Sequence, residues 1–287
     1  MATTAVTGLI VSLCSIASAG VSFPIRDGQV EAQLVSSQAA VQPGTTVLVG
    51  LRLKMDDGWH TYWQNPGESG QPTAITWNLP PGFVAHDIDW PAPEYFEFGG
   101  LASYGYHGEI VLPVRIDVPA QLDESRVTLR AEADWLMCEE SCIPGSASLA
   151  LTLPVTDDPA VAGRPTLHAG LFAWAEKHRP QTAEGITAAF DTDHAVYTLE
   201  LPHPAKPANA PDAVVANFFP HDATTLNMSA RQNIRPTSGG SLELTLTPNP
   251  RYDRPASLRG VLVVGDGSGS NARAYLVNAP LRTVADE

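Results

Sequence analysis

The chain has 287 residues, 44% hydrophobic and 17% charged, so it is long enough for one large or two ordinary globular domains. Its formal net charge of −14, with 17 lysines and arginines, argues against nucleic acid or an anionic membrane surface as a partner. The 25 prolines and 23 glycines, with few long helical patterns, favour an all-β fold with many turns.

The first segment, residues 1–19, is predicted to be a signal peptide. Residues 5–17 are apolar and mostly small, and Ala-Ser-Ala at 17–19 fits a cleavage site. The first four residues lack the lysine or arginine that such signals normally carry. Cleavage would remove Cys14 and leave two cysteines, an even number that suits an oxidising compartment.

Residues 20–156 are predicted to form a first β domain. Predicted strands cover residues 21–35, 45–55, 59–64, 75–79, 109–118, 126–138 and 148–155. The aromatic strand after Asp57-Gly58 contains Trp59, Tyr62 and Trp63, which are expected to pack in the core; a partner-binding surface is the alternative.

Residues 94–106 combine aromatic residues with glycines and are predicted to be an irregular segment. Two interpretations stay open for it: a movable flap that covers a site, or an ordinary connection packed on the core.

Cys138 and Cys142 flank a predicted hairpin turn of Glu139, Glu140 and Ser141. Cysteines across so tight a turn can reach the Cα separation of a disulfide, about 4.4–6.8 Å. A closed loop of about five residues gains only roughly 2 kcal/mol from chain entropy, so the bond would be a weak staple. The tip of a hairpin is also accessible to another protein's thiol. The pattern favours a redox pair, with a purely structural disulfide as the alternative.

Residues 157–182 are predicted to be a linker with a helix at 166–178, which Pro180 ends. Residues 183–287 are predicted to be a second β-sandwich. Its predicted strands cover residues 186–190, 195–201, 214–219, 226–231, 242–247, 258–264 and 272–277. The glycine-rich loop at 265–271 is expected to be a hairpin turn, because no helix follows it and calcium-ligand spacing is absent.

A group of motifs in the first domain occurs together. They are Gly-Trp-His-Thr-Tyr-Trp-Gln-Asn-Pro-Gly at 58–67, Trp-Pro-Ala-Pro at 90–93, Tyr-Gly-Tyr at 104–106 with Leu-Pro-Val at 112–114, and Trp-Leu-Met-Cys at 135–138 with Cys-Ile-Pro at 142–144. In combination they resemble the N-terminal periplasmic domain of transmembrane thiol:disulfide reductases of the DsbD and ScsB type. The ScsB branch looks closer. The resemblance covers residues 21–155, and the second unit matches ScsB by layout.

The resemblance implies an all-β protein with two immunoglobulin-like β-sandwich domains joined by a short linker helix. It implies that the cysteine pair carries electrons from a thioredoxin-like domain of a transmembrane reductase to periplasmic thioredoxin-fold proteins such as disulfide isomerases. Cys142 would form the mixed disulfides and Cys138 would resolve them. The family's cap loop, which shields the pair from oxidants, would fall within Tyr95 to Gly100, with Phe96 or Phe98 as the covering ring.

This sequence departs from the best-known DsbD proteins in two ways. Only three residues separate the cysteines, and no membrane-spanning helices follow Glu287. We therefore expect a periplasmic protein that is either the ectodomain of an inner-membrane reductase or a stand-alone relative. A membrane contact would come only through a missing C-terminal part, and no cofactor is expected.

The local charges bear on which thiol attacks. Glu139 and Glu140, without a nearby cation or helix N-terminus, predict a normal or raised pKa for Cys142. We therefore expect a partner's low-pKa thiolate to begin the attack on the disulfide.

Two rival interpretations remain. One is a binding module with a purely structural disulfide. The other is a copper or zinc site in which Met137 and the two cysteines combine with His60 or His107. The cysteine pair has no local histidine, so the prediction assigns no metal ligand. Hydrolytic catalysis has no supporting motif.

Overall fold

The structure is a computed structural model that describes residues 20–202, 215–238, 240–265 and 272–284, without the side chains of Val21 and Phe98. The predicted signal peptide and most of the predicted loop at 265–271 lie outside these residues. The described chain is all-β, as predicted, with two helices, α1 (Pro159–Ala162) and α2 (Ala169–Lys177). Within it, no helix is long and apolar enough to cross a membrane.

Two sheets pack face to face in the first unit. The first sheet has the order β1-β12-β11-β5-β9-β8, with β6 also on β11, and the second has the order β2-β3-β4-β10-β7. The strands of the first sheet are β1 (Val21–Ser22), β5 (His60–Gly67), β6 (Ala74–Asn78), β8 (Glu94–Phe98), β9 (Leu101–His107), β11 (Arg126–Cys138) and β12 (Cys142–Pro154). Those of the second are β2 (Ile25–Asp27), β3 (Val30–Ser36), β4 (Thr46–Met55), β7 (Val84–Ile88) and β10 (Glu109–Asp117).

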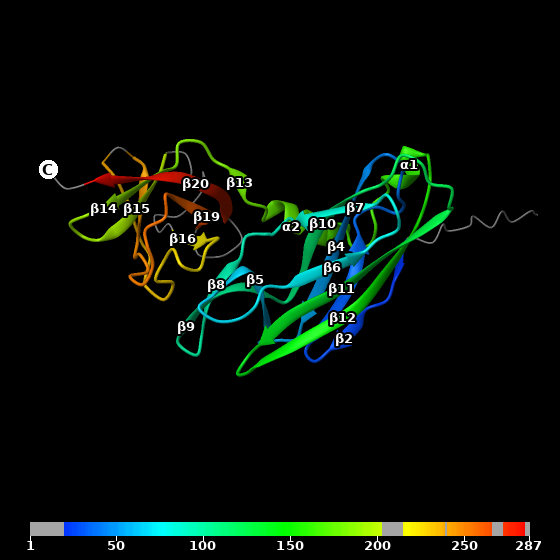
Figure 1. Ribbon diagram of the computed structural model, residues 1–287, viewed down its shortest axis with the longest axis horizontal. Helices are drawn as coiled ribbons and strands as arrows, with labels where there is room; N and C mark the ends of the chain where they lie inside the picture. Colours follow the sequence, from blue (N-terminus) through cyan, green and yellow to red (C-terminus); the bar gives the residue numbers. More distant parts are fainter. Residues whose placement is uncertain (1–19, 203–214, 239, 266–271, 285–287) are drawn as a thin grey trace, which may run out of the picture.

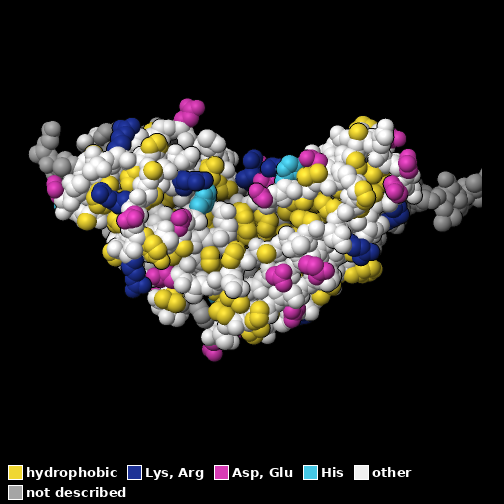
Figure 2. Space-filling model, in the orientation of Figure 1, with side chains coloured by type: hydrophobic (Ala, Val, Ile, Leu, Met, Phe, Trp, Pro, Cys, Tyr) yellow, Lys and Arg dark blue, Asp and Glu magenta, His cyan; other side chains and the backbone are white. Residues whose placement is uncertain are grey.

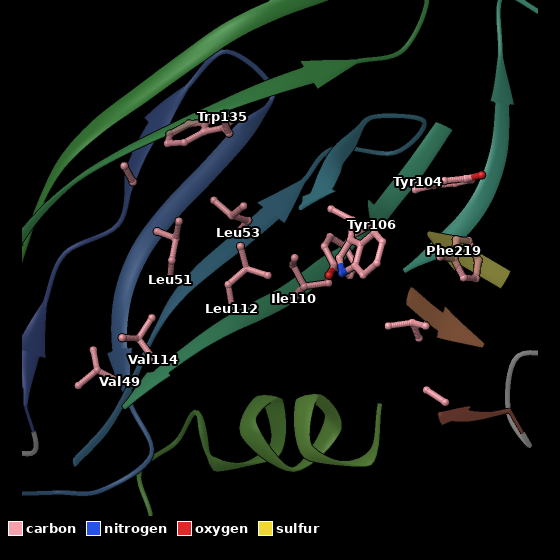
Figure 3. Close-up of a cluster of buried hydrophobic side chains, with 14 of the residues drawn as sticks. Val49, Leu51, Leu53, Tyr104, Tyr106, Ile110, Leu112, Val114, Trp135 and Phe219 are labelled. Carbon is pink, nitrogen blue, oxygen red and sulfur yellow. The ribbon is translucent and has the colours of Figure 1, made fainter. Parts of the chain in front are cut away.

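The core of this sandwich follows the alternation of the strands. In β4, Val49, Leu51 and Leu53 are fully buried, and in β11 the buried positions alternate with exposed ones. Figure 3 shows the β4 side chains lying beside those of the neighbouring strand β10, with Trp135 of β11 above them. Residues two apart on a strand share a face, which explains why the alternation predicted this packing.

Two local predictions in the first unit were wrong. Residues 94–106 are not irregular: β8 and β9 form a hairpin in which Tyr95 lies opposite Tyr104. The turn is made by Gly99 and Gly100, both with positive φ, so these glycines mark the tight turn of a hairpin rather than an irregular loop. Residues 21–35 form three short strands instead of one, and β7 was not predicted.

The linker helix packs on the outer face of the second sheet. Phe172 and Ala175 of α2 are buried against Val35 and Val111. The helix begins at residue 169, later than the predicted 166, because the Thr166 side chain donates a hydrogen bond to the carbonyl oxygen of Ser36 and ties that residue to the end of β3.

Strands β13–β20 form one eight-stranded sheet in the order β16-β19-β20-β14-β15-β18-β17, with β13 on β20. Residues 273–280 of β20 pair with β19, and residues 281–284 pair with β14, so β20 connects the two parts of the sheet. The strands are β13 (Gln181–Thr182), β14 (Thr187–Asp191), β15 (Val196–Leu201), β16 (Val215–Pro220), β17 (Asn233–Pro236), β18 (Leu242–Leu246), β19 (Ser257–Gly265) and β20 (Arg273–Val284).

One predicted strand of this unit, at residues 226–231, is wrong. Leu226 and Met228 are buried, but the segment turns, with the Ala230 N–H donating to the Asn227 carbonyl oxygen. Burial of alternate residues here comes from a packed loop, and β17 follows it.

The two units lie end to end with α2 near their junction, and β5, β8 and β9 are on the side of the first unit that faces the second (Figure 1).

Candidate redox site

The cysteine pair forms a disulfide at the tip of the β11–β12 hairpin. The ladder of this hairpin is continuous from Arg126 opposite Pro154 to Cys138 opposite Cys142. The two Cα atoms are 4.2 Å apart, and the predicted turn of three residues closes the loop. The long hairpin therefore fixes both cysteines by its register.

The two sulfur atoms have different surroundings. Cys138 has 0% exposure, whereas Cys142 is exposed and is followed by Ile143, which is 38% exposed. Glu139 and Glu140 in the turn are also exposed. Because exchange requires access to sulfur, an incoming thiol can approach Cys142 but not Cys138.

Tyr62 lies against the buried sulfur. Its hydroxyl donates a hydrogen bond to Cys138 Sγ at 3.0 Å and is 3.8 Å from Cys142 Sγ. The contact exists because β5 lies next to β11 in the sheet, with His60 opposite Cys138. Tyr62 is fully buried, and burial raises the pKa of its hydroxyl, so it keeps its proton at neutral pH.

His60 extends this contact. Its Nε2 lies 3.3 Å from the Tyr62 hydroxyl oxygen, which can accept a hydrogen bond from the Nε2–H tautomer while the hydroxyl donates to Cys138. Burial, followed by repulsion from His107, lowers the pKa of His60 to about 4. His60 is therefore neutral at physiological pH, and a chain of hydrogen bonds can run from His60 through Tyr62 to Cys138.

The β8–β9 hairpin covers the histidines. The Phe96 ring contacts His60 with a centroid distance of 4.3 Å and His107 with 4.7 Å. Glu94 holds His107, with its Oε2 at 3.2 Å from Nδ1. Tyr95, the next residue, instead packs near Tyr104 at 6.3 Å. Of the predicted cap residues, Phe96 is thus beside the site and Tyr95 is directed elsewhere; the side chain of Phe98 lies outside the described residues.

A glycine allows the cysteine turn to approach β5. Gly58 has a φ of +85°, and a Cβ at this position would lie 2.6 Å from Glu139 Oε1. The predicted Asp57-Gly58 turn therefore brings the chain close to the carboxylate beside the disulfide, and a side chain there would be strained.

The described residues offer no cluster of three or more His, Cys, Asp or Glu side chains that could hold a metal ion. His60 and His107 are neighbours, with ring centroids 5.6 Å apart, but the ring of Phe96 packs against both. The copper or zinc interpretation therefore has no assembled ligand set in this part of the chain.

The sequence prediction does not place two side chains of β5 at the cysteine pair. It places Tyr62 in core packing or on a partner-binding surface, and it considers His60 only as a distant metal ligand. Both lie in the motif at 58–67, and its polar residues between aromatic ones were the available signal. Only the order of the strands shows that they meet Cys138.

A separate cavity of about 620 Å³ lies where the two units meet. Tyr95 and Tyr106 border it from the first unit, Trp174 from α2, and Phe219 and Arg273 from the second unit. Neither cysteine lines it. In the space-filling view, hydrophobic side chains gather in the hollow between the two ends of the molecule (Figure 2).

Comparison with known proteins finds a family model and solved structures that resemble this chain. Residues 31–154 match the family model of the N-terminal region of the thiol:disulfide interchange protein DsbD. The chain is similar in fold to the N-terminal periplasmic domain of ScsB from Proteus mirabilis, with a TM-score of 0.61 and 19% identity over 88% of this chain and 94% of that one. A protein of unknown function from Porphyromonas gingivalis W83 aligns with 88% of this chain and 100% of its own at 13% identity, but its TM-score is only 0.27.

No curated protein sequence matches the chain. The likeness to ScsB spans both units and establishes the shared fold, while the family match is confined to the first unit. The matched residues include both cysteines, Tyr62, His60 and Phe96. The domain that carries the Cys138–Cys142 pair therefore matches the DsbD N-terminal family model, and the chain as a whole shares the fold of the ScsB N-terminal periplasmic domain.

Proposed function

We propose that this chain is a periplasmic thiol:disulfide interchange protein. Its cysteine pair receives electrons from a thioredoxin-like reductase domain and passes them to periplasmic thioredoxin-fold proteins such as disulfide isomerases. The observation that carries the proposal is the asymmetry of the pair: Cys142 is exposed at a hairpin tip, and Cys138 is buried against the hydroxyl of Tyr62. A staple that closes so short a loop has little structural use.

Reduction of the pair begins with a thiolate of the reductase domain. That thiolate attacks Cys142 Sγ, a bond forms between the two sulfur atoms, and the bond between Cys142 and Cys138 breaks. The electron pair leaves on Cys138 Sγ, which then takes a proton. A second thiolate of the reductase then attacks the reductase sulfur of the mixed disulfide, and Cys142 leaves as a thiolate. The reductase domain thereby becomes oxidised to a disulfide, and Cys142 and Cys138 are both reduced.

Delivery to a partner reverses the roles. The Cys142 thiolate attacks a sulfur of the partner's disulfide, and one partner cysteine leaves as a thiolate. Cys138 then attacks Cys142 Sγ, which releases the second partner thiolate and restores the disulfide. Burial of Cys138 suits the resolving role, because this sulfur needs to reach only Cys142.

Tyr62 assists the sulfur that cannot contact water. Negative charge develops on Cys138 Sγ when the disulfide opens, and the hydroxyl at 3.0 Å can donate to it. A hydrogen bond to a charged atom contributes about 1.5–3 kcal/mol, more than one to a neutral disulfide sulfur. The bond therefore stabilises the leaving thiolate more than the starting disulfide, and it accelerates opening.

Phe96 is proposed as the covering ring of the site. It packs on His60, which lies opposite Cys138, and so it restricts approach from the β8–β9 side. A partner would have to move or avoid this hairpin, and small oxidants would be hindered on the same side, while Cys142 itself stays exposed.

The reduction potential of the Cys138–Cys142 pair tests the proposal first. Equilibration with dithiothreitol or glutathione buffers should give a value between about −180 and −270 mV, the range of exchange proteins. A value well below about −300 mV would instead identify a structural disulfide, as in the binding-module interpretation.

Trapping tests the roles of the two cysteines. A Cys138→Ala variant should accumulate mixed disulfides with thioredoxin-fold proteins through Cys142, because nothing resolves them. The matched Cys142→Ala variant, which leaves only the buried sulfur, should trap little. Equal trapping by both variants would contradict the assigned roles.

A further inference from the structure

Strand β5 connects the disulfide to the second unit, and its pairing with β9 is interrupted between the two. His60 to Tyr62 pair with Gly105 to His107, but pairing resumes only at Gly67 opposite Ser103. Residues 63–66 therefore leave the regular ladder directly after Tyr62. Such irregularities change the direction of neighbouring side chains and are frequent next to active sites.

The irregular segment is held from outside the first unit. Asn65 is only 3% exposed, and its Nδ2 donates a hydrogen bond of 2.7 Å to the carbonyl oxygen of Pro220 in β16. Its Oδ1 accepts from the N–H of Gly67 at 3.1 Å. One buried amide thus closes the turn of β5 and binds that turn to the second unit. A buried amide is costly to leave unpaired, so this link favours a single arrangement.

Aromatic packing reinforces the same contact. Phe219 of β16 is buried, with its ring centroid 6.3 Å from that of Trp63 and 5.0 Å from that of Tyr104. Figure 3 shows Phe219 beside Tyr104, on an element that reaches the first unit from the other side of the junction. Successive strand residues point to opposite faces, so Trp63 meets Phe219 while Tyr62 meets the cysteine sulfur.

We propose that the second unit positions Tyr62 for thiol exchange. Through Pro220 and Phe219, β16 fixes the irregular part of β5 and thereby holds the Tyr62 hydroxyl on Cys138 Sγ. Asn65 is a positioning residue in this scheme, since it acts through Tyr62 and touches neither sulfur. The inference rests on the proposed function in that it assigns the second unit a part in the chemistry of the same cysteine pair.

The expected effect follows from the geometry of hydrogen bonds. Their strength falls steeply once the donor angle or distance is lost, so a small shift of β5 would weaken the contact of Tyr62 with Cys138. Loss of one hydrogen bond of ordinary net strength corresponds to about a threefold to tenfold change in rate. Loosening the junction should therefore slow disulfide opening by about that factor.

A double-mutant cycle in the full chain tests the coupling. The measured quantity is the second-order rate constant for reduction of the oxidised protein by dithiothreitol, which needs no protein partner. Asn65→Ala and Tyr62→Phe should each slow the reaction, and the double variant should be no slower than Tyr62→Phe alone. Thr128→Val, which removes a hydrogen bond to Thr152 away from β5, is the matched control and should leave the rate unchanged.

The same cycle with Phe219→Leu changes only the second unit. The effect of Phe219→Leu on the rate should likewise disappear in the Tyr62→Phe background. If Asn65→Ala does not fold, Phe219→Leu alone tests whether the junction acts through Tyr62. An unchanged rate in a folded junction variant, or full multiplication of the two effects, would overturn the proposal. The reductant in this cycle is a small molecule, so the result does not depend on whether the protein partners can be trapped. Failure of trapping would count against the proposed function, whereas absence of coupling would count only against the positioning of Tyr62 by the second unit.

Discussion

Replacement of Tyr62 by phenylalanine removes one oxygen atom from the site and keeps the ring. The lost hydroxyl lies 3.0 Å from Cys138 Sγ, on a cysteine with 0% exposure. Bulk water is excluded at this position, so it does not readily replace the donor. Of all single changes near the pair, this one tests the proposed mechanism most directly.

The size of the effect follows from the charge that develops on sulfur. A hydrogen bond to a charged group is worth about 1.5–3 kcal/mol, and the bond to the uncharged disulfide is weaker. In Tyr62→Phe, most of this stabilisation of the transition state is therefore lost, and the disulfide should open about 10 to 100 times more slowly. Burial raises the pKa of Tyr62, so the hydroxyl should act at all pH values from about 6 to 9.

Stopped-flow reduction of the oxidised protein by dithiothreitol, with quantification of free thiols, measures the rate. Tyr104→Phe is the matched control, because the buried hydroxyl of Tyr104 has no hydrogen-bond partner among the described residues. That variant should keep the wild-type rate. A Tyr62→Phe rate within about twofold of wild type would show that the hydroxyl does not stabilise the leaving sulfur.

Three further outcomes are expected. Phe96→Ala should oxidise faster with hydrogen peroxide after reduction and lose roughly 1–2 kcal/mol of stability, whereas Tyr95→Ala should leave the oxidation rate unchanged. Because the folded pKa of His60, about 4, lies below the unfolded value near 6.5, its contribution to stability is complete above pH 6.5 and is lost as the pH falls toward 4. Urea unfolding at pH 7 and pH 4.5 measures this loss as a fall in the free energy of unfolding. The fall should be about 2–3 kcal/mol smaller for His60→Gln than for the wild type, and equal falls would contradict the lowered pKa of His60. Replacing both Cys138 and Cys142 by serine should lower the unfolding free energy by no more than about 2 kcal/mol, and a loss above about 4 kcal/mol in the same assay would favour a structural bond.

Local patterns in the sequence determined the hairpin that carries the cysteines. The alternation of apolar and polar residues along 126–133 and the short turn of Glu139 to Ser141 predict two paired strands, and the structure has them in continuous register. These features depend on neighbours in the chain, where strand periodicity and turn geometry act directly. The same reasoning failed at residues 94–106, because paired glycines in a tight turn and glycines in a loose loop look alike in sequence.

The surroundings of the sulfur atoms depend on the order of the strands, which periodicity does not encode. Tyr62 and Cys138 are 76 positions apart, and they meet only because β5 is placed next to β11. Asn65 and Pro220, which are 155 positions apart, meet only where the two units pack together. The sequence by itself thus determined a cysteine pair on a hairpin in an all-β chain. The tertiary structure decided which sulfur is buried and which hydroxyl faces it, because strand order and the packing of the units bring these distant residues into contact.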